Sequence, residues 1–167
     1  AAELSGQKRL LLIGCGAGRE AFAFEKLGFE VTATDIAAAM VDAALRVGAR
    51  TGSSVQFHLG TWPPDDLARF DLVYVTANMV NHVPGAENRI AFFSEVCRRL
   101  SDGGCLCFSP DVFSLTEPTR FALGSWVLRA RSWLGLGQWE RGDTVRSYLG
   151  DHSKADSTLV YYHYYQS

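Results

Sequence analysis

Short apolar runs alternate with stretches of helical periodicity along the first two-thirds of the chain. The apolar runs predict strands at Arg9–Ile13, Glu30–Thr34, Val55–Leu59, Asp71–Thr76 and Cys105–Ser109. The periodic stretches predict helices at Arg19–Leu27, Ala37–Val47 and Glu87–Leu100. Strands that alternate with helices are typical of parallel sheets, and the nearly continuous apolar run at Asp71–Thr76 indicates a strand covered by helices on both faces. We therefore expect an α/β fold with a doubly wound, mostly parallel sheet and helices on both faces.

The two longer helices each carry an apolar stripe that predicts their buried side. On the helix that ends at Gly48, the stripe consists of Met40, Ala44 and Val47. On the next helix, the stripe consists of Ile90, Phe93, Cys97 and Leu100, and the side chains of Arg89, Arg98 and Arg99 are expected off it. A turn at Ser101–Gly104 is expected before the last strand.

Beyond Pro110 the pattern changes. An apolar stripe that includes Trp126 predicts an amphipathic helix from Thr119 to Leu134. Thr144–Leu149 and Thr158–Tyr165 predict a C-terminal antiparallel hairpin. We expect one domain over residues 1–167, in which residues 1–110 form a ligand-binding core and residues 111–167 form a cover of one helix and the hairpin.

Composition and charge are those of a soluble globular protein, with 47% hydrophobic residues, 20% charged residues and a net charge of −2. This charge gives no long-range attraction to nucleic acid or anionic membranes, so we expect neither partner. The sequence has no apolar stretch long enough to span a membrane, and we expect a cytoplasmic protein. Its four cysteines, Cys15, Cys97, Cys105 and Cys107, form no C-x-x-C pair, so we expect reduced, mostly buried thiols and no metal site.

The segment that carries chemistry follows the first strand, where Gly14, Gly16 and Gly18 open a helix. Glycine lets another molecule approach the main chain closely, and the start of a helix presents free N–H groups. Ligands of open α/β sheets bind at the carboxyl ends of the strands. We interpret the segment as a ligand-binding loop, the alternative being a tight turn without a ligand.

The spacing of the glycines distinguishes a dinucleotide from other ligands that contain a nucleoside. A dinucleotide fingerprint, G-x-G-x-x-G, needs glycine at position 19, where this sequence has Arg19. Asp35 ends the second strand about 20 residues beyond the first glycine, where a carboxylate can accept two hydrogen bonds from a ribose diol. Asp35 therefore indicates an adenosine-containing ligand without choosing among such ligands, and it can also cap the helix that begins at Ala37.

The glycines at alternate positions, G-x-G-x-G, resemble the first motif of class I S-adenosylmethionine (SAM)-dependent methyltransferases. Four further segments resemble that family in order: Asp35–Met40, His58–Trp62, Phe70–Val75 and Arg99–Gly104. The resemblance extends from Leu10 to Ser109. It implies a Rossmann-like core that binds SAM, and its product S-adenosylhomocysteine (SAH), without a metal.

The resemblance also implies which residues bind the cofactor. By position in the family's motifs they are Gly14, Cys15, Gly16, Ala17, Gly18, Asp35, Ile36, Met40, Gly60, Thr61, Trp62, Thr76, Ala77 and Asn78. Two departures concern this site: Leu12 stands where many members have an acid that holds the methionine amino group, and Thr61 stands where an acid usually meets adenine. The Thr61 hydroxyl can still bond the adenine amine. A third departure, Asp102 in place of a turn proline, is harmless.

The expected reaction is a direct displacement that requires mainly alignment of the acceptor with the methyl group. A base is needed only for acceptors that lose a proton, and His82 is the candidate because imidazole takes up protons near neutral pH. The alternative is a histidine that bonds the backbone or lines the cofactor. Candidate substrate residues are Asn81, His82, Trp126 and Tyr148.

We therefore predict a SAM-dependent methyltransferase that acts on an unidentified small-molecule acceptor. The alternatives are a catalytically silent SAM-binding module and a nicotinamide-dependent oxidoreductase, which Arg19 and the lack of a Tyr-x-x-x-Lys pair disfavour. Family members usually have further elements before the first strand and after a segment such as Tyr162–Ser167, so we expect this chain to lack flanking elements at both ends. We make no prediction of its oligomeric state.

Overall fold

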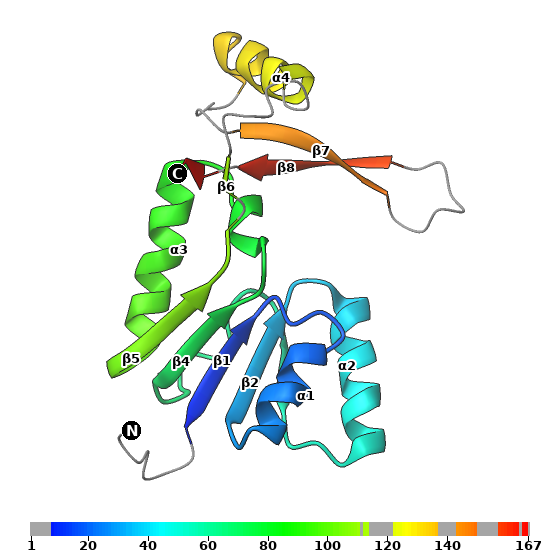
Figure 1. Cartoon of the computed structure of the whole chain (residues 1–167), viewed down its shortest axis with the longest axis vertical. Helices are drawn as coiled ribbons and strands as arrows, with labels where there is room; N and C mark the ends of the chain where they lie inside the picture. Colours follow the sequence, from blue (N-terminus) through cyan, green and yellow to red (C-terminus); the bar gives the residue numbers. More distant parts are fainter. Residues whose placement is uncertain are drawn as a thin grey trace. The chain divides into compact units, whose positions relative to one another are not determined.

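The first 110 residues form a five-stranded sheet. The computed structural model describes residues 8–110, 112–113, 122–136, 143–149, 157–163 and 165–166. The sheet consists of β1 (Arg9–Ile13), β2 (Glu30–Asp35), β3 (Gln56–Leu59), β4 (Phe70–Val75) and β5 (Leu100–Phe108), in the order β3-β2-β1-β4-β5. All four pairings are parallel, and Figure 1 shows β5, β4, β1 and β2 side by side. The predicted α/β class with a parallel sheet is confirmed.

Three helices connect these strands: α1 (Arg19–Lys26), α2 (Ala38–Thr51) and α3 (Ala86–Arg99). The chain runs outward from β1 to β2 and β3, and in the opposite direction from β4 to β5. Because parallel crossovers are right-handed, this order places α1 and α2 on one face of the sheet and α3 on the other. The direction changes between β1 and β4, so their carboxyl ends form the crevice where ligands of such sheets bind.

The core is built on β1, whose Leu10, Leu11 and Leu12 are fully buried. Burying one such side chain contributes roughly 1.5–3 kcal/mol, so β1 is a major source of stability in the sheet. On the face toward α1, the rings of Phe24 and Tyr74 pack with their centroids 5.2 Å apart. The hydrophobic sequence of this strand therefore fixes the centre of the sheet.

Helix α2 is one turn longer than predicted. Gly48 does not end it but lies buried in its last turns, where its Cα faces the rings of Phe22 and Phe57. The helix ends instead at Gly52, whose φ of +69° is the left-handed conformation that closes a helix. The buried side consists of Val41, Ala44 and Gly48. Ala44 was therefore predicted correctly, whereas Met40 and Val47 were each wrong by one position.

Helix α3 is rotated relative to the prediction. Its buried residues are Arg89, Phe92, Val96 and Arg99, whereas Ile90 is 66% exposed and Cys97 is also exposed. The prediction failed because it excluded arginine from the buried side. A guanidinium can be buried when its N–H groups are paired, and Arg99 donates to a carbonyl and two carboxylates.

Strand β5 begins earlier than predicted because the expected turn lies inside it. Phe70 pairs with Leu100 and Leu72 with Cys105, so β5 has three more residues than β4 between these two pairs. The excess forms a bulge that contains Gly103, with φ +77°. Cys105 and Cys107 on this strand are exposed, as is Cys97, so the expectation of mostly buried thiols holds only for Cys15.

The chain divides into two compact units, residues 1–76 with 94–109, and residues 77–93 with 110–167. Besides the first part of α3, the second unit contains a 3₁₀ helix η1 (Met79–His82), β6 (Val112–Phe113), α4 (Ala122–Trp133), β7 (Asp143–Leu149), β8 (Ser157–His163) and β9 (Tyr165–Gln166). Strands β7 and β8 pair antiparallel. The predicted connection between them lies outside the described residues, so the hairpin stays a prediction. Among the described residues, no helix has both the length and the apolar character of a membrane span.

Candidate functional site

The segment Gly14–Gly18, here called the glycine loop, is fixed at the carboxyl ends of β1 and β2. The N–H groups of Gly14 and Cys15 both donate to the Thr34 carbonyl, each at 2.9 Å. The Gly18 N–H donates to the Cys15 carbonyl at 2.9 Å, and the Gly18 carbonyl accepts the first hydrogen bond of α1 from Phe22. The loop therefore passes directly from the sheet into the helix, as the sequence predicted.

Asp35 joins this loop to the end of β2. Its Oδ2 accepts a hydrogen bond from the Gly16 N–H at 2.7 Å, and its Oδ1 accepts one from the Ala37 N–H at 2.9 Å. The N-cap of α2 is Ala37 itself and has no side-chain cap, so Asp35 holds the residue before the helix rather than capping the helix. Each carboxylate oxygen has a second acceptor site, which leaves capacity for two hydroxyl donors.

Gly16 leaves open space beside the loop. Its φ is +53°, and a Cβ atom placed on it would have no heavy atom within 4 Å. Gly18 differs, because a Cβ atom there would lie 2.8 Å from the Phe22 ring. The main chain at Gly16 is therefore open to close approach by another molecule, whereas Gly18 is required by packing of α1.

Large apolar side chains surround the carboxyl ends of β2 and β3 and are exposed. Ile36 is 76% exposed, Leu59 60% and Met40 48%. The sequence pointed to Ile36 and Met40 but missed Leu59, which lies opposite Asp35 in the register of β2 and β3. That register was the signal that could have identified it, since residues at one height on neighbouring parallel strands lie at the same edge.

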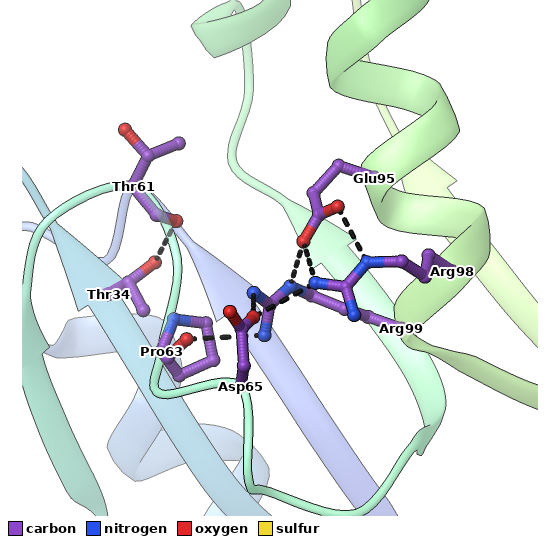
Figure 2. A network of polar contacts seen from close by, with 7 residues as sticks. All are labelled: Thr34, Thr61, Pro63, Asp65, Glu95, Arg98 and Arg99. Atoms are coloured by element: carbon purple, nitrogen blue, oxygen red, sulfur yellow. Dashed lines mark hydrogen bonds and ion pairs between the residues drawn. The ribbon is translucent and has the colours of Figure 1, made fainter.

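The segment after β3 is attached to β2 at two points. The Gly60 N–H donates to the Asp35 carbonyl at 2.8 Å, and the hydroxyl of Thr34 donates to the Thr61 carbonyl at 3.0 Å (Figure 2). Thr61 is exposed and Trp62 is half-buried. Thr34 is fully buried and was not identified from the sequence, where it reads only as a strand residue.

Cys15 lies within the glycine loop, but its thiol is unreactive. Its side chain is buried, and this burial, together with the nearby Asp35 carboxylate, raises the pKa of the thiol to about 12. The thiol therefore stays protonated at neutral pH and is not a nucleophile.

The remaining candidates lie mostly in the second unit. Thr76 ends the first unit, its N–H donating to the Ile13 carbonyl at 3.1 Å. Ala77 is exposed, and Asn78 adopts a left-handed conformation with φ +64° before η1. On η1, Asn81 is fully buried and His82 is half-buried.

Two of the candidate substrate residues lie in the C-terminal third of the chain. Trp126 on α4 is 72% exposed, and the side chain of Tyr148 lies outside the described residues. The structure thus has Gly14–Gly18, Asp35, Ile36 and Gly60–Trp62 in the first unit, and the roles of the candidates in both units stay predictions.

A groove of about 720 Å³ lies beside the segment after β3. Its lining residues are His58, Leu59, Trp62, Pro63, Pro64, Asp65, Glu95, Arg98 and Arg99. Its charged groups pair with one another, and the close contacts with the Arg98 side chain lower the pKa of Glu95 to about 2. Sequence analysis did not predict this groove, because it brings together residues more than 30 positions apart.

A family model described as "Methyltransferase domain" matches residues 10–104. The chain belongs to the class I SAM-dependent methyltransferase family. No curated protein matches its sequence.

Solved structures agree with this assignment at the level of the fold. A SAM-dependent methyltransferase from Methanosarcina mazei is 18% identical, with a TM-score of 0.77 over 98% of this chain and 75% of that one. The CcbJ methyltransferase from Streptomyces caelestis is 25% identical, with a TM-score of 0.58 over 64% of this chain and 44% of that one. The glycopeptide N-methyltransferase MtfA in complex with SAM is 17% identical, with a TM-score of 0.58 over 98% and 62%. The chain therefore spans less than half of CcbJ.

The residues of this chain are compatible with SAM, the cofactor of its family. The open space at Gly16 admits a ligand to the main chain, and Asp35 retains acceptor sites for a ribose diol. The exposed Ile36 and Leu59 are apolar surfaces of a kind against which a purine can pack. In the described part of the chain, no three His, Cys, Asp or Glu side chains are grouped as a metal site requires.

Proposed function

We propose that this chain transfers a methyl group from SAM to a small-molecule acceptor by direct displacement. The observation that carries the proposal is the pairing of the Asp35 carboxylate with the Gly16 N–H beside open space. This pairing puts a charged acceptor and a side-chain-free main chain at one point. Both are needed to hold a ribose and the chain attached to it.

Each part of the site has a proposed task. The main chain of Gly14–Gly18 lies along the methionine and ribose part of the cofactor, and Asp35 accepts from the ribose hydroxyls. Ile36, Met40 and Leu59 contact the adenine, and Thr61 meets its amine. Bound SAM supplies an electrophilic methyl group. The protein's contribution is then to hold the acceptor in line with it, which lowers the barrier by roughly 7–11 kcal/mol when two reactants are fully oriented.

The proposal of a small-molecule acceptor rests on sequence and similarity. The segment Thr76–Pro84 lacks the Asn/Asp-Pro-Pro-aromatic motif of enzymes that methylate nucleic-acid bases or glutamine, and the net charge is −2. One structure of similar fold is named a glycopeptide N-methyltransferase. We assign residues 1–110 to cofactor binding and residues 111–167 to acceptor recognition, with His82 as the base for acceptors that lose a proton.

Calorimetry on purified protein tests the cofactor site. We expect the wild type to bind SAM and SAH and not NAD. Gly16→Arg should abolish binding because the new side chain fills the open space beside the loop. Gly52→Arg is the matched control: Gly52 also has a positive φ and open surroundings, but it lies at the far end of α2. Equal losses in the two variants would contradict the site.

Asp35→Ala tests the carboxylate in the same assay. The loss of charge-assisted hydrogen bonds is expected to weaken SAH binding by at least about tenfold, the equivalent of roughly 1.5–3 kcal/mol. Asp42→Ala, on the exposed side of α2, is the control and should bind SAH like the wild type. Undiminished binding by Asp35→Ala would sink the proposed ribose contact.

A catalytically silent SAM-binding module is the second candidate. Leu12, which is fully buried, occupies the place of the acid that holds the methionine amino group in many members. An assay for SAH production over a panel of small-molecule acceptors separates the two. Binding of SAM without turnover on any acceptor class favours the module.

A further inference from the structure

The segment from Gly60 to Asp65, here called the adenine-edge loop, is held by an arginine from the end of α3. Arg99 is only 7% exposed and its guanidinium reaches the loop at three residues. Its Nη1 donates to the Pro63 carbonyl at 3.2 Å, and its Nη2 donates to the Asp65 carboxylate at 2.6 Å. The guanidinium also lies over the Trp62 ring, 5.4 Å from its centroid. Figure 2 shows Arg99 directed at Pro63 and Asp65.

A carboxylate on the same helix orients this guanidinium. Glu95 Oε1 accepts a hydrogen bond from Arg99 Nε at 2.7 Å, four residues along α3. Because a guanidinium is planar, fixing Nε also fixes the direction of the two terminal nitrogens. The fork is therefore presented to the loop in one orientation.

Thr34 holds the same loop from the sheet. Its hydroxyl donates to the Thr61 carbonyl at 3.0 Å, and its side chain is fully buried. Only Trp62 lies between the Thr61 carbonyl, which this bond holds, and the Arg99 contacts at Pro63 and Asp65. The two attachments thus fix the main chain of Thr61, which the proposed function places at the adenine amine, and of the residues directly after it.

The charged groups of the adjoining groove do not form a ligand site of their own. Arg98 donates to Glu95 and Asp65, and Arg99 donates to the same two carboxylates. Each charge in the groove is already matched by an opposite one. The network is better suited to fixing the loop than to recognising a second ligand.

We propose that Arg99 and Thr34 are positioning residues that set the adenine-edge loop so that Thr61 can bond the adenine amine. This inference rests on the proposed function, since it presumes SAM at the carboxyl ends of β1, β2 and β3. Thr34 is fully buried and Arg99 only 7% exposed, so in this proposal they act through the loop and not by contact with the cofactor. Their effect is on which purine the site accepts rather than on whether the protein folds.

Two ligands separate positioning from general stability. SAH carries the adenine amine, whereas the analogue of SAH with purine in place of adenine lacks it. The wild type should bind SAH about fivefold more tightly than the analogue, the value of one neutral hydrogen bond. In Arg99→Lys the planar fork is lost, so the loop shifts, SAH affinity falls about fivefold and the preference for SAH falls to about one.

Matched variants complete the test. Arg98→Lys removes an arginine that pairs with the same carboxylates but is 54% exposed and has no hydrogen bond to the loop backbone, so it should keep the preference for SAH. Thr34→Val should lose the preference, whereas Thr32→Val, a buried threonine on the same face of β2, should keep it. Thermal unfolding of each variant verifies that the protein compared is folded.

The outcomes distinguish the inference from the proposed function. A wild type that binds neither ligand overturns both. A wild type that binds SAH without preferring it to the analogue overturns the inference and leaves the cofactor site standing. The same holds if Arg99→Lys and Thr34→Val retain the preference. Loss of preference in these two variants, with retention in Arg98→Lys and Thr32→Val, supports the inference.

Discussion

At the scale of single residues, the sequence left two interpretations of Asp35 open. Its position at the end of β2 predicted a ribose contact or a helix cap. The structure shows a third contact, in which the carboxylate accepts the Gly16 N–H and so fixes the glycine loop. Sequence patterns identify a carboxylate and its neighbours in the chain. They do not show which main-chain group 19 residues earlier it will meet.

His82 carries the residue-scale prediction for catalysis. His82→Ala is expected to lower turnover about 10²–10⁴-fold on an acceptor that must lose a proton, the usual contribution of a general base. SAM affinity should change much less, because a base acts on the acceptor. Turnover is measured by SAH release on any acceptor that the wild type methylates, and affinity by calorimetry. Parallel losses of turnover and affinity would argue for a cofactor contact instead.

At the scale of elements, hydrophobic patterning predicted where strands lie but misjudged helix faces. The bounds of β1 were predicted correctly because its sequence, RLLLI, is a short and nearly unbroken apolar run, which is typical of a buried strand. On α3 the same approach chose Ile90 and Cys97, whereas the buried side includes Arg89 and Arg99. Burial of arginine depends on partners such as Pro63 and Asp65, which are distant in sequence. No local pattern contains that information.

The network at the end of α3 predicts a dependence of stability on pH. Hydrogen bonds, first from Arg98 and then from Arg99, lower the pKa of Glu95 from its ordinary 4.5 to about 2. A carboxylate with a lowered pKa stabilises the folded state above its unfolded pKa, and this contribution is lost as the pH falls toward the folded pKa. The loss is therefore expected between about pH 4.5 and pH 2.

Glu95→Gln isolates this contribution, because the amide has the same shape and does not titrate. The wild type should unfold at a higher temperature than the variant near neutral pH, and the difference should shrink as the pH falls from 4.5 toward 2. Thermal unfolding followed by circular dichroism measures it. A difference that stays constant over this range would show that Glu95 contributes no charge-dependent stability.

At the scale of the whole molecule, the fold was predicted best where several independent sequence patterns indicated the same architecture. Strand–helix alternation, the turn residues and the ordered motifs all indicated one parallel sheet, and the structure has it. Sequence patterns suggested a boundary near residue 110, but they did not indicate that residues 77–93 belong with the C-terminal third. Such a grouping depends on contacts that only the folded chain displays.

The assignment of the cofactor site to the first unit also predicts which segments will gain protection from hydrogen exchange when the cofactor binds. Saturating SAH, at about 100 times its Kd, should raise the free energy of unfolding by about 2.7 kcal/mol. Hydrogen exchange measured by mass spectrometry should then show added protection in peptides that contain Gly14–Gly18, Asp35–Met40 and Gly60–Trp62. Because these segments lie at the carboxyl ends of the strands, peptides at the opposite ends, around Arg9 and Glu30, should gain least. NAD at the same concentration is the control and should protect none of them. Protection confined to the second unit would place the cofactor elsewhere and refute the assignment of the site to the first.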